Sequence, residues 1–173
     1  MFICCTLAAP PASDNHPRVR RDADDIMLRE VCEDSSRSNL DIANRVRDRL
    51  RDEMDGDYQW VVVVQDEDKC CAYWADRHWL LNNRCGKNII VIREEKPAQG
   101  CTETQRNSAR ADILLSPHVS GSSACEDLRD ALETGNLNSA DFVVVEDAAY
   151  AYHKTTSCFV NEVVNGFRVM AML

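Results

Sequence analysis

The sequence predicts an α+β protein of two repeated modules, each an amphipathic helix packed on an antiparallel β-sheet, stabilised by disulfides. Three observations predict this fold: an amphipathic stretch before a run of valines, the same order again later in the chain, and nine cysteines. With 173 residues, the chain is long enough to bury an apolar core.

The N-terminal segment has the features of a secreted protein. "MFICCTLAAPPAS" has a short apolar run and then small residues, like the end of a secretory signal. Arg18, Arg20 and Arg21 follow as a polybasic site of the kind that processing proteases cut, although a solvated basic patch is the alternative. We favour secretion because the two features occur in the expected order. Residues 1–21 are assigned to a signal-like segment and propeptide-like tail, and we expect an extracellular protein.

The first module is predicted over residues 38–95, after an N-terminal arm (22–37) that is read as either a short helix or an edge strand. In residues 40–54 apolar side chains recur every three or four positions, which indicates a helix. In "QWVVVVQDEDKCCAYW" (59–74) four β-branched valines predict a strand, the charged run a turn, and the last residues a returning strand that completes a hairpin. "CGKNIIVIRE" is the expected last strand.

The second module is predicted over residues 123–173, because the same features return in the same order. Val46 and Leu50 correspond to Leu128 and Leu132, and Trp60 with its valines to Phe142 with its valines. Residues 96–122 between the modules are polar and Ser-rich, so they are interpreted as a linker. Its apolar stretch, 111–116, is a possible strand.

The first module resembles the dynein light chain family. The resemblance covers residues 40–94 and rests on "LDIANRVRDRLRDEMDGDYQWVVVV" and on "RHWLLNNRCGKNIIVIRE". It implies an antiparallel sheet whose exposed edge accepts an extended peptide, with dimer formation beside it. The family's members are reduced, cytoplasmic, single-module proteins with two full helices before the sheet. Here the module is duplicated and cysteine-rich, and the first helix is expected to be shortened or lost. The edge residues implied here are Cys71, Ala72, Tyr73 and Trp74, and in the second copy Ala149, Tyr150, Ala151 and Tyr152.

The cysteines are interpreted as structural. Adjacent side chains on a strand point to opposite faces, so Cys70 and Cys71 are not expected to share a metal ion or a bridge. The chain also lacks the CxxC pairs typical of structural zinc and of redox catalysis. Loss of the first 21 residues would leave an odd number, which predicts three intrachain bridges and one thiol that is free or bonded to another molecule. The disulfide candidates are Cys32, Cys70, Cys71, Cys85, Cys101, Cys125 and Cys158.

Several function classes are disfavoured. A net charge of −9 argues against nucleic acid as a partner, because binding a phosphate backbone needs surplus Lys and Arg. No apolar run approaches the ~20 residues of a membrane span. The four histidines lie in separate segments with no nucleophile in a recognisable elbow, so we expect no catalytic residues, cofactor or metal.

The sequence therefore predicts a non-enzymatic, secreted structural or assembly protein. Its partner would be itself, through sheet edges or strand addition, with head-to-tail growth into a filament as one form. The alternative is a peptide-binding adaptor resembling dynein light chains, in which an extended peptide adds to a sheet edge.

Overall fold

A computed structural model of the chain describes residues 17–34, 36–53, 58–75, 78–95, 100–135, 137–146, 148–153 and 158–173. The elements alternate between pairs of helices and groups of four strands. They are α1 (Pro17–Cys32), α2 (Asn39–Glu53), β1 (Tyr58–Asp66), β2 (Cys71–Trp74), β3 (His78–Arg84), β4 (Lys87–Glu95), α3 (Glu103–Leu114), α4 (Ala124–Glu133), β5 (Asp141–Glu146), β6 (Ala149–His153), β7 (Phe159–Val164) and β8 (Phe167–Met172). The α+β class and the antiparallel sheets are confirmed. None of the helices in these ranges is long and apolar enough to cross a membrane.

Helix α1 corrects the expected N-terminal arm. The sequence predicts either a short helix or an edge strand in residues 22–37, and a first helix that is shortened or lost. Instead α1 has 16 residues and begins at Pro17, so the boundary drawn at residue 21 falls inside it. Ala23, Met27 and Val31 are buried at four-residue steps, which is the spacing of one helix face. Residues 1–16, with most of the signal-like segment, lie outside the described residues.

Helix α3 corrects the expected linker. The strand proposed for 111–116 is wrong, because Glu103–Leu114 is helical. The helix begins with a capping box, in which the Thr102 side chain accepts from the Gln105 backbone and Gln105 caps the Thr102 backbone in return. Only Ala109 and Ile113 of this helix are buried, so its apolar face is too narrow to stand out in the sequence.

The two sheets are assembled from both halves of the chain. One has the strand order β3-β4-β1-β6 and the other β2-β5-β8-β7, with every pair antiparallel. The predicted hairpin of residues 59–74 is wrong, because β1 pairs with β4 on one side and β6 on the other. Both edges of β1 are thus occupied, and β2 instead crosses to pair with β5. Each sheet therefore holds three strands from one half and one strand from the other.

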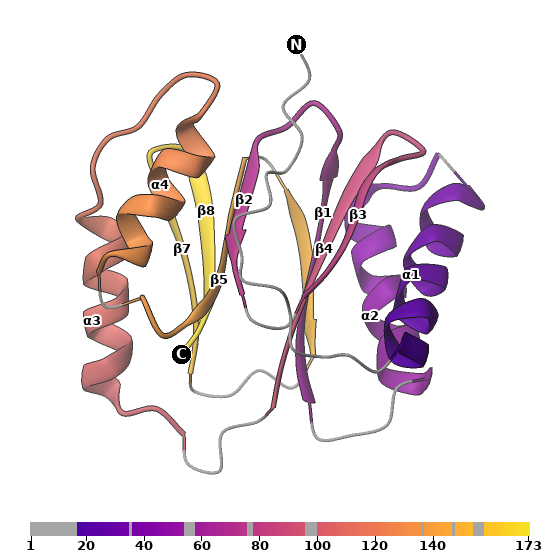
Figure 1. Cartoon of the computed structure of the whole chain (residues 1–173), viewed down its shortest axis with the longest axis horizontal. Helices are drawn as coiled ribbons and strands as arrows, with labels where there is room; N and C mark the ends of the chain where they lie inside the picture. The colour runs from indigo at the N-terminus through magenta and orange to yellow at the C-terminus, as the bar shows by residue number, and fades with distance from the viewer. Residues whose placement is uncertain are drawn as a thin grey trace.

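Four layers result, with the two sheets face to face and a pair of helices on each outer side (Figure 1). Val62 and Val64 pack under α1 and α2, whereas Val61 and Val63 pack between the sheets. A strand covered on both faces has no solvent side, and this explains the uninterrupted run of valines. In the second sheet, Val144 likewise faces α3 and α4.

The last hairpin of each sheet has the same turn. Cys85 and Gly86 connect β3 to β4 with φ of 53° and 78°, and Asn165 and Gly166 connect β7 to β8 with φ of 54° and 85°. Two consecutive positive φ angles are typical of the type I′ turn, whose twist matches that of the flanking strands. Glycine suits the second position because it has no Cβ to strain.

Candidate functional site

The predicted edge strands do lie at the ends of their sheets. β2 carries Cys71, Ala72, Tyr73 and Trp74 and ends one sheet, while β6 ends the other. The two candidate edges lie in different sheets and come from opposite halves of the chain. Their residues do not meet in one site.

In β6, the backbone N–H and C=O groups of Tyr150 and Tyr152 point away from β1, towards the open edge of the sheet. The backbone N–H of Glu67, just after β1, donates to Gly86 on the β4 side at 3.1 Å. Along an antiparallel strand, the backbone N–H and C=O groups of successive residues point to opposite sides. Those of Val62 and Val64 therefore point towards β6, where they form hydrogen bonds with the backbones of Ala151 and Ala149. The N–H and C=O groups of Tyr150 and Tyr152 therefore point away from the sheet. No hydrogen bond reaches them from any residue that the structure describes.

The same alternation gives a different result for β2. The backbone N–H of Glu146 donates to the Cys70 carbonyl at 3.1 Å. By the same alternation, the backbone N–H and C=O groups of Ala72 and Trp74 point towards β5, and those of Cys71 and Tyr73 point away from it. Cys71 and Tyr73 each have further interaction partners, as does Ala75 just after the strand. We therefore do not treat β2 as an open edge, and β6 is the stronger candidate.

The remaining terminal strands carry features that protect sheet edges. The register of β3 against β4 is irregular between Leu81 and Arg84. β7 has a charged residue near its middle, Glu162, which pairs with Arg110 of α3 at 3.0 Å. Irregular registers and charges discourage pairing with another chain. Residues 149–152 of β6, Ala-Tyr-Ala-Tyr, have neither a charge nor a proline.

The side chains of β6 divide by face. Ala151 is buried in the core beneath α2, which packs against β6 as well as β1. Tyr150 and Tyr152 lie on the opposite face and stack on each other, with ring centroids 6.4 Å apart and planes inclined by 19°. Tyr152 continues the row to Phe159 of the other sheet at 5.6 Å, yet 48% of its surface stays exposed. This aromatic row thus borders the open edge.

Arg168 holds Tyr150 in place. Its guanidinium carbon lies 5.0 Å from the centroid of the Tyr150 ring, and its Nη1 donates to Oδ1 of Asn161 at 2.8 Å. A cation over an aromatic face is attracted by the negative charge density of the ring. Because Arg168 is on β8, this contact connects β6 with the second sheet.

The cysteines serve the fold. Three bridges join Cys32 to Cys85, Cys70 to Cys125 and Cys101 to Cys158. Cys71 is disulfide-bonded as well, so all seven candidates are bonded in the full chain. The odd thiol, free or bonded to another molecule, is predicted for a chain that has lost its first 21 residues, and it stays a prediction. The bonding partner of Cys71 lies outside the described residues.

The doublet does point to opposite faces, as expected. Cys70 packs on the helix side of the second sheet, where it bonds Cys125 of α4, and Cys71 is buried between the sheets. Adjacent strand positions alternate in direction, which is why the two sulfurs have different surroundings.

Among the groups that the structure describes, those with shifted pKa values lie on segments other than β6. Burial raises the pKa of Tyr73, although the charge of Arg129 acts in the opposite direction. The hydrogen bond from Lys87 lowers the pKa of Asp66 at the end of β1. Glu30, almost fully buried on α1, pairs with Arg37 and Arg49 at 3.3 and 2.5 Å. These groups join elements of the fold and do not converge on a cleft.

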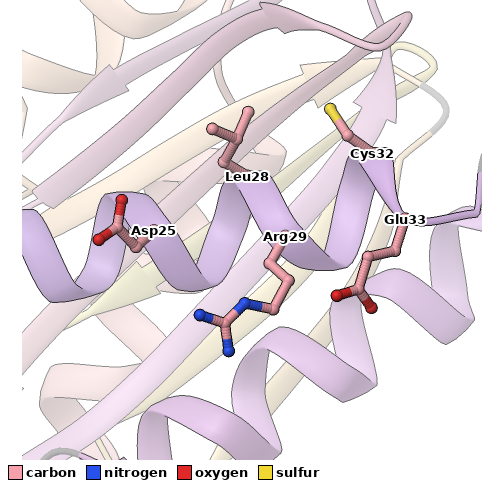
Figure 2. A pocket seen from close by; sticks show the side chains of 5 residues that line it. All are labelled: Asp25, Leu28, Arg29, Cys32 and Glu33. Carbon is pink, nitrogen blue, oxygen red and sulfur yellow. The ribbon is translucent and has the colours of Figure 1, made fainter.

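Residues of α1 line a hollow of about 410 Å³ (Figure 2). It is open to solvent and lined by Asp25, Leu28, Arg29, Cys32 and Glu33. The sulfur of Cys32 in this lining is bonded to Cys85, so it is not a thiolate nucleophile. Within the described ranges, no three His, Cys, Asp or Glu side chains are placed to hold a metal ion.

The histidines and the processing residues remain scattered. His118 is exposed in the loop between α3 and α4, and His78 and His153 lie in strands of the first sheet, at opposite ends of its strand order. Arg18, Arg20 and Arg21 lie in the first turns of α1. His16 lies outside the described residues.

Comparison with known protein families, with curated proteins and with solved structures finds no match to this chain.

Proposed function

We propose that this chain is a non-enzymatic assembly protein that joins its partner by strand addition at the outer edge of β6. One observation carries the proposal: Tyr150 and Tyr152 present outward N–H and C=O groups on a regular strand edge that lacks charges and prolines. Such an edge is a template for another strand unless it is covered. Each hydrogen bond formed there adds about 0.5–1.5 kcal/mol, so side-chain contacts beside the edge must contribute too.

The side chains beside the edge support this role. Tyr152 is a large, half-exposed aromatic that a new strand would cover. Aromatic residues are enriched at protein interfaces because they bury much area at little entropic cost. The incoming strand would lie along α2 on one face and along the aromatic row on the other.

We further propose that the two halves are copies of one module, in a dynein light chain-like arrangement. Arg47 of α2 donates through Nε and Nη2 to Asp48, and Arg129 of α4 donates through the same atoms to Asp130. Both halves also end in a hairpin with the same positive-φ turn. The crossed strands β2 and β6 would then make the chain a covalently linked pseudo-dimer.

Secretion is part of the proposal. Disulfides persist in oxidising compartments, and the bridges among the described cysteines suit an extracellular protein. The signal-like segment and the basic residues before Asp22 are the other support. Cleavage after Arg21 would have to open the first turns of α1.

Hydrogen exchange combined with light scattering tests the proposed function. The mass should rise with protein concentration, and the amides of Tyr150 and Tyr152 should become protected in parallel. The amides of Ala149 and Ala151 are the internal control, because they bond β1 and should be protected at every concentration. A chain that stays monomeric, with fast-exchanging Tyr150 and Tyr152 amides throughout, would refute the assembly role.

A peptide-binding adaptor is the second candidate, and the position of α2 along β6 favours it. A linear peptide could occupy the same edge. It would protect the same two amides in one-to-one stoichiometry while the protein itself remains monomeric. Head-to-tail growth into a filament would instead need a second edge such as β2, whose outward residues already have partners.

A further inference from the structure

We infer that the strand added at β6 is the β6 of a second copy of this chain, paired antiparallel about a two-fold axis at Ala151. The inference rests on the proposed function and names its partner. The product would be a closed dimer in which two four-stranded sheets become one continuous sheet. A symmetric contact of this kind uses the same surface on both copies, so it stops at two.

The outward hydrogen-bonding groups fix the register. With the axis at Ala151, Tyr150 lies opposite Tyr152 of the second copy, and Tyr152 lies opposite its Tyr150. Because these are the residues whose N–H and C=O groups point outward, every such group on both strands finds a partner. An axis at Tyr150 or Tyr152 would instead pair one tyrosine with a residue beyond the ends of β6.

The side chains are also self-complementary in this register. Both faces of β6 repeat, with alanine towards α2 and tyrosine on the other face. Opposed tyrosines would join the two aromatic rows into one, and aromatic pairs across neighbouring strands stabilise sheets. On the other face, the two Ala151 side chains meet, and their small size leaves room for the α2 helices to approach.

A second copy suits this edge better than a short peptide does. Within β6 as the structure describes it, the edge offers two outward residues, and association must first offset the lost freedom of both partners. A peptide would gain little beyond those hydrogen bonds. A second copy adds its own tyrosine pair and its own α2, which enlarges the buried area towards that of a stable interface.

The test uses the full chain with its native disulfides, measured by sedimentation velocity over a range of concentrations. Tyr152→Pro removes an outward N–H that β1 does not use, so the fold should tolerate it. Tyr152→Ala removes the same ring but keeps the N–H. We expect the dimer dissociation constant to rise at least tenfold more for Tyr152→Pro than for Tyr152→Ala, with unchanged circular dichroism. Equal effects of the two variants would overturn the inference.

A cross-link tests the register without weakening the strand. In the two-fold arrangement the two Ala151 residues form a non-hydrogen-bonded pair, about 4.5 Å apart between Cα atoms, which suits a disulfide. Ala151→Cys should therefore give a covalent dimer on oxidation, with the linked peptide identified by mass spectrometry. Ala149→Cys is the matched control. In the two-fold arrangement, residue 149 of each copy lies opposite His153 of the other, so the two introduced cysteines are too far apart to form a disulfide.

The outcomes separate the inference from the proposed function. A covalent dimer from Ala151→Cys and none from Ala149→Cys supports the two-fold pairing. Association without the Ala151→Cys cross-link overturns the two-fold pairing and leaves strand addition standing. A monomer at every concentration, with unprotected Tyr150 and Tyr152 amides, overturns both.

Discussion

Val62 lies directly opposite Ala151 in the first sheet, although the two residues come from opposite halves of the chain. The reciprocal pair in the second sheet is Ala72 opposite Val144. Each half therefore completes the sheet of the other, and neither sheet has its full set of strands without both halves.

This exchange predicts a single unfolding transition. Opening either sheet releases a strand that belongs to the other half, so the two should unfold together. Tryptophan fluorescence, which reports Trp60 and Trp79 in the first sheet and Trp74 in the second, should change at the same denaturant midpoint as circular dichroism. Two separated transitions would show that the halves are independent.

The buried carboxylate of Glu30 should contribute measurably to stability. It receives ion pairs from Arg37 and Arg49 and so joins α1 to α2. Glu30→Gln should reduce the free energy of unfolding by about 1.5–3 kcal/mol in urea denaturation, the range for hydrogen bonds to charged groups. Glu53→Gln removes an exposed pair with the same Arg49 and should cost under about 1 kcal/mol. Equal losses would mean that burial does not matter here.

Gly166 should be sensitive to substitution for conformational reasons alone. Its φ is 85°, and a Cβ added there would meet no atom within 4 Å. Gly166→Ala should therefore cost about 1–2 kcal/mol through backbone strain without any clash. Asn165→Gly, at φ 54°, should change the free energy of unfolding by less than about 1 kcal/mol, because asparagine tolerates this region. Thermal denaturation of both variants checks the contrast.

Tyr73 should make the protein sensitive to alkali. Because burial raises its pKa in the folded state, the unfolded chain releases this proton first as the pH rises. Stability should therefore fall as the pH rises above about 10, the ordinary tyrosine pKa, and hold below it. Phenolate absorbance should show Tyr73 titrating late, as a component that Tyr73→Phe removes. In Tyr73→Phe this part of the pH dependence should vanish. If it persists, a group other than Tyr73 causes the loss of stability in alkali.

Local patterns in the sequence were enough to predict several elements. The helix at residues 40–54 and the valine strands follow from spacing and β-branching, and Val46, Leu50, Leu128 and Leu132 are all buried as their spacing required. Helix α3 was missed because its composition is polar and only two of its residues face the core. A short helix was one of two alternatives for residues 22–37, but the start of α1 was not predicted, because its first turn overlaps the basic stretch that was assigned to the tail.

The strands at residues 71–74 and 149–152 were predicted as edges through the resemblance to dynein light chains, and both do end their sheets. Which sheet each would join was not foreseen. The charged run after Asp66 is compatible with a tight turn or with a crossing, since both need solvated residues.

The sequence by itself determined which segments could be helices and strands, because periodicity and β-branching act on neighbouring residues. The run of four valines predicted a strand, but only the packing of the two sheets showed that β1 is buried on both faces. Only the tertiary structure decided that β2 and β6 exchange sheets and that the backbone N–H and C=O groups of Tyr150 and Tyr152 lie at an open edge. Hydrogen bonds between strands join backbone groups that every residue has, so the choice of partner depends on how the four layers pack together.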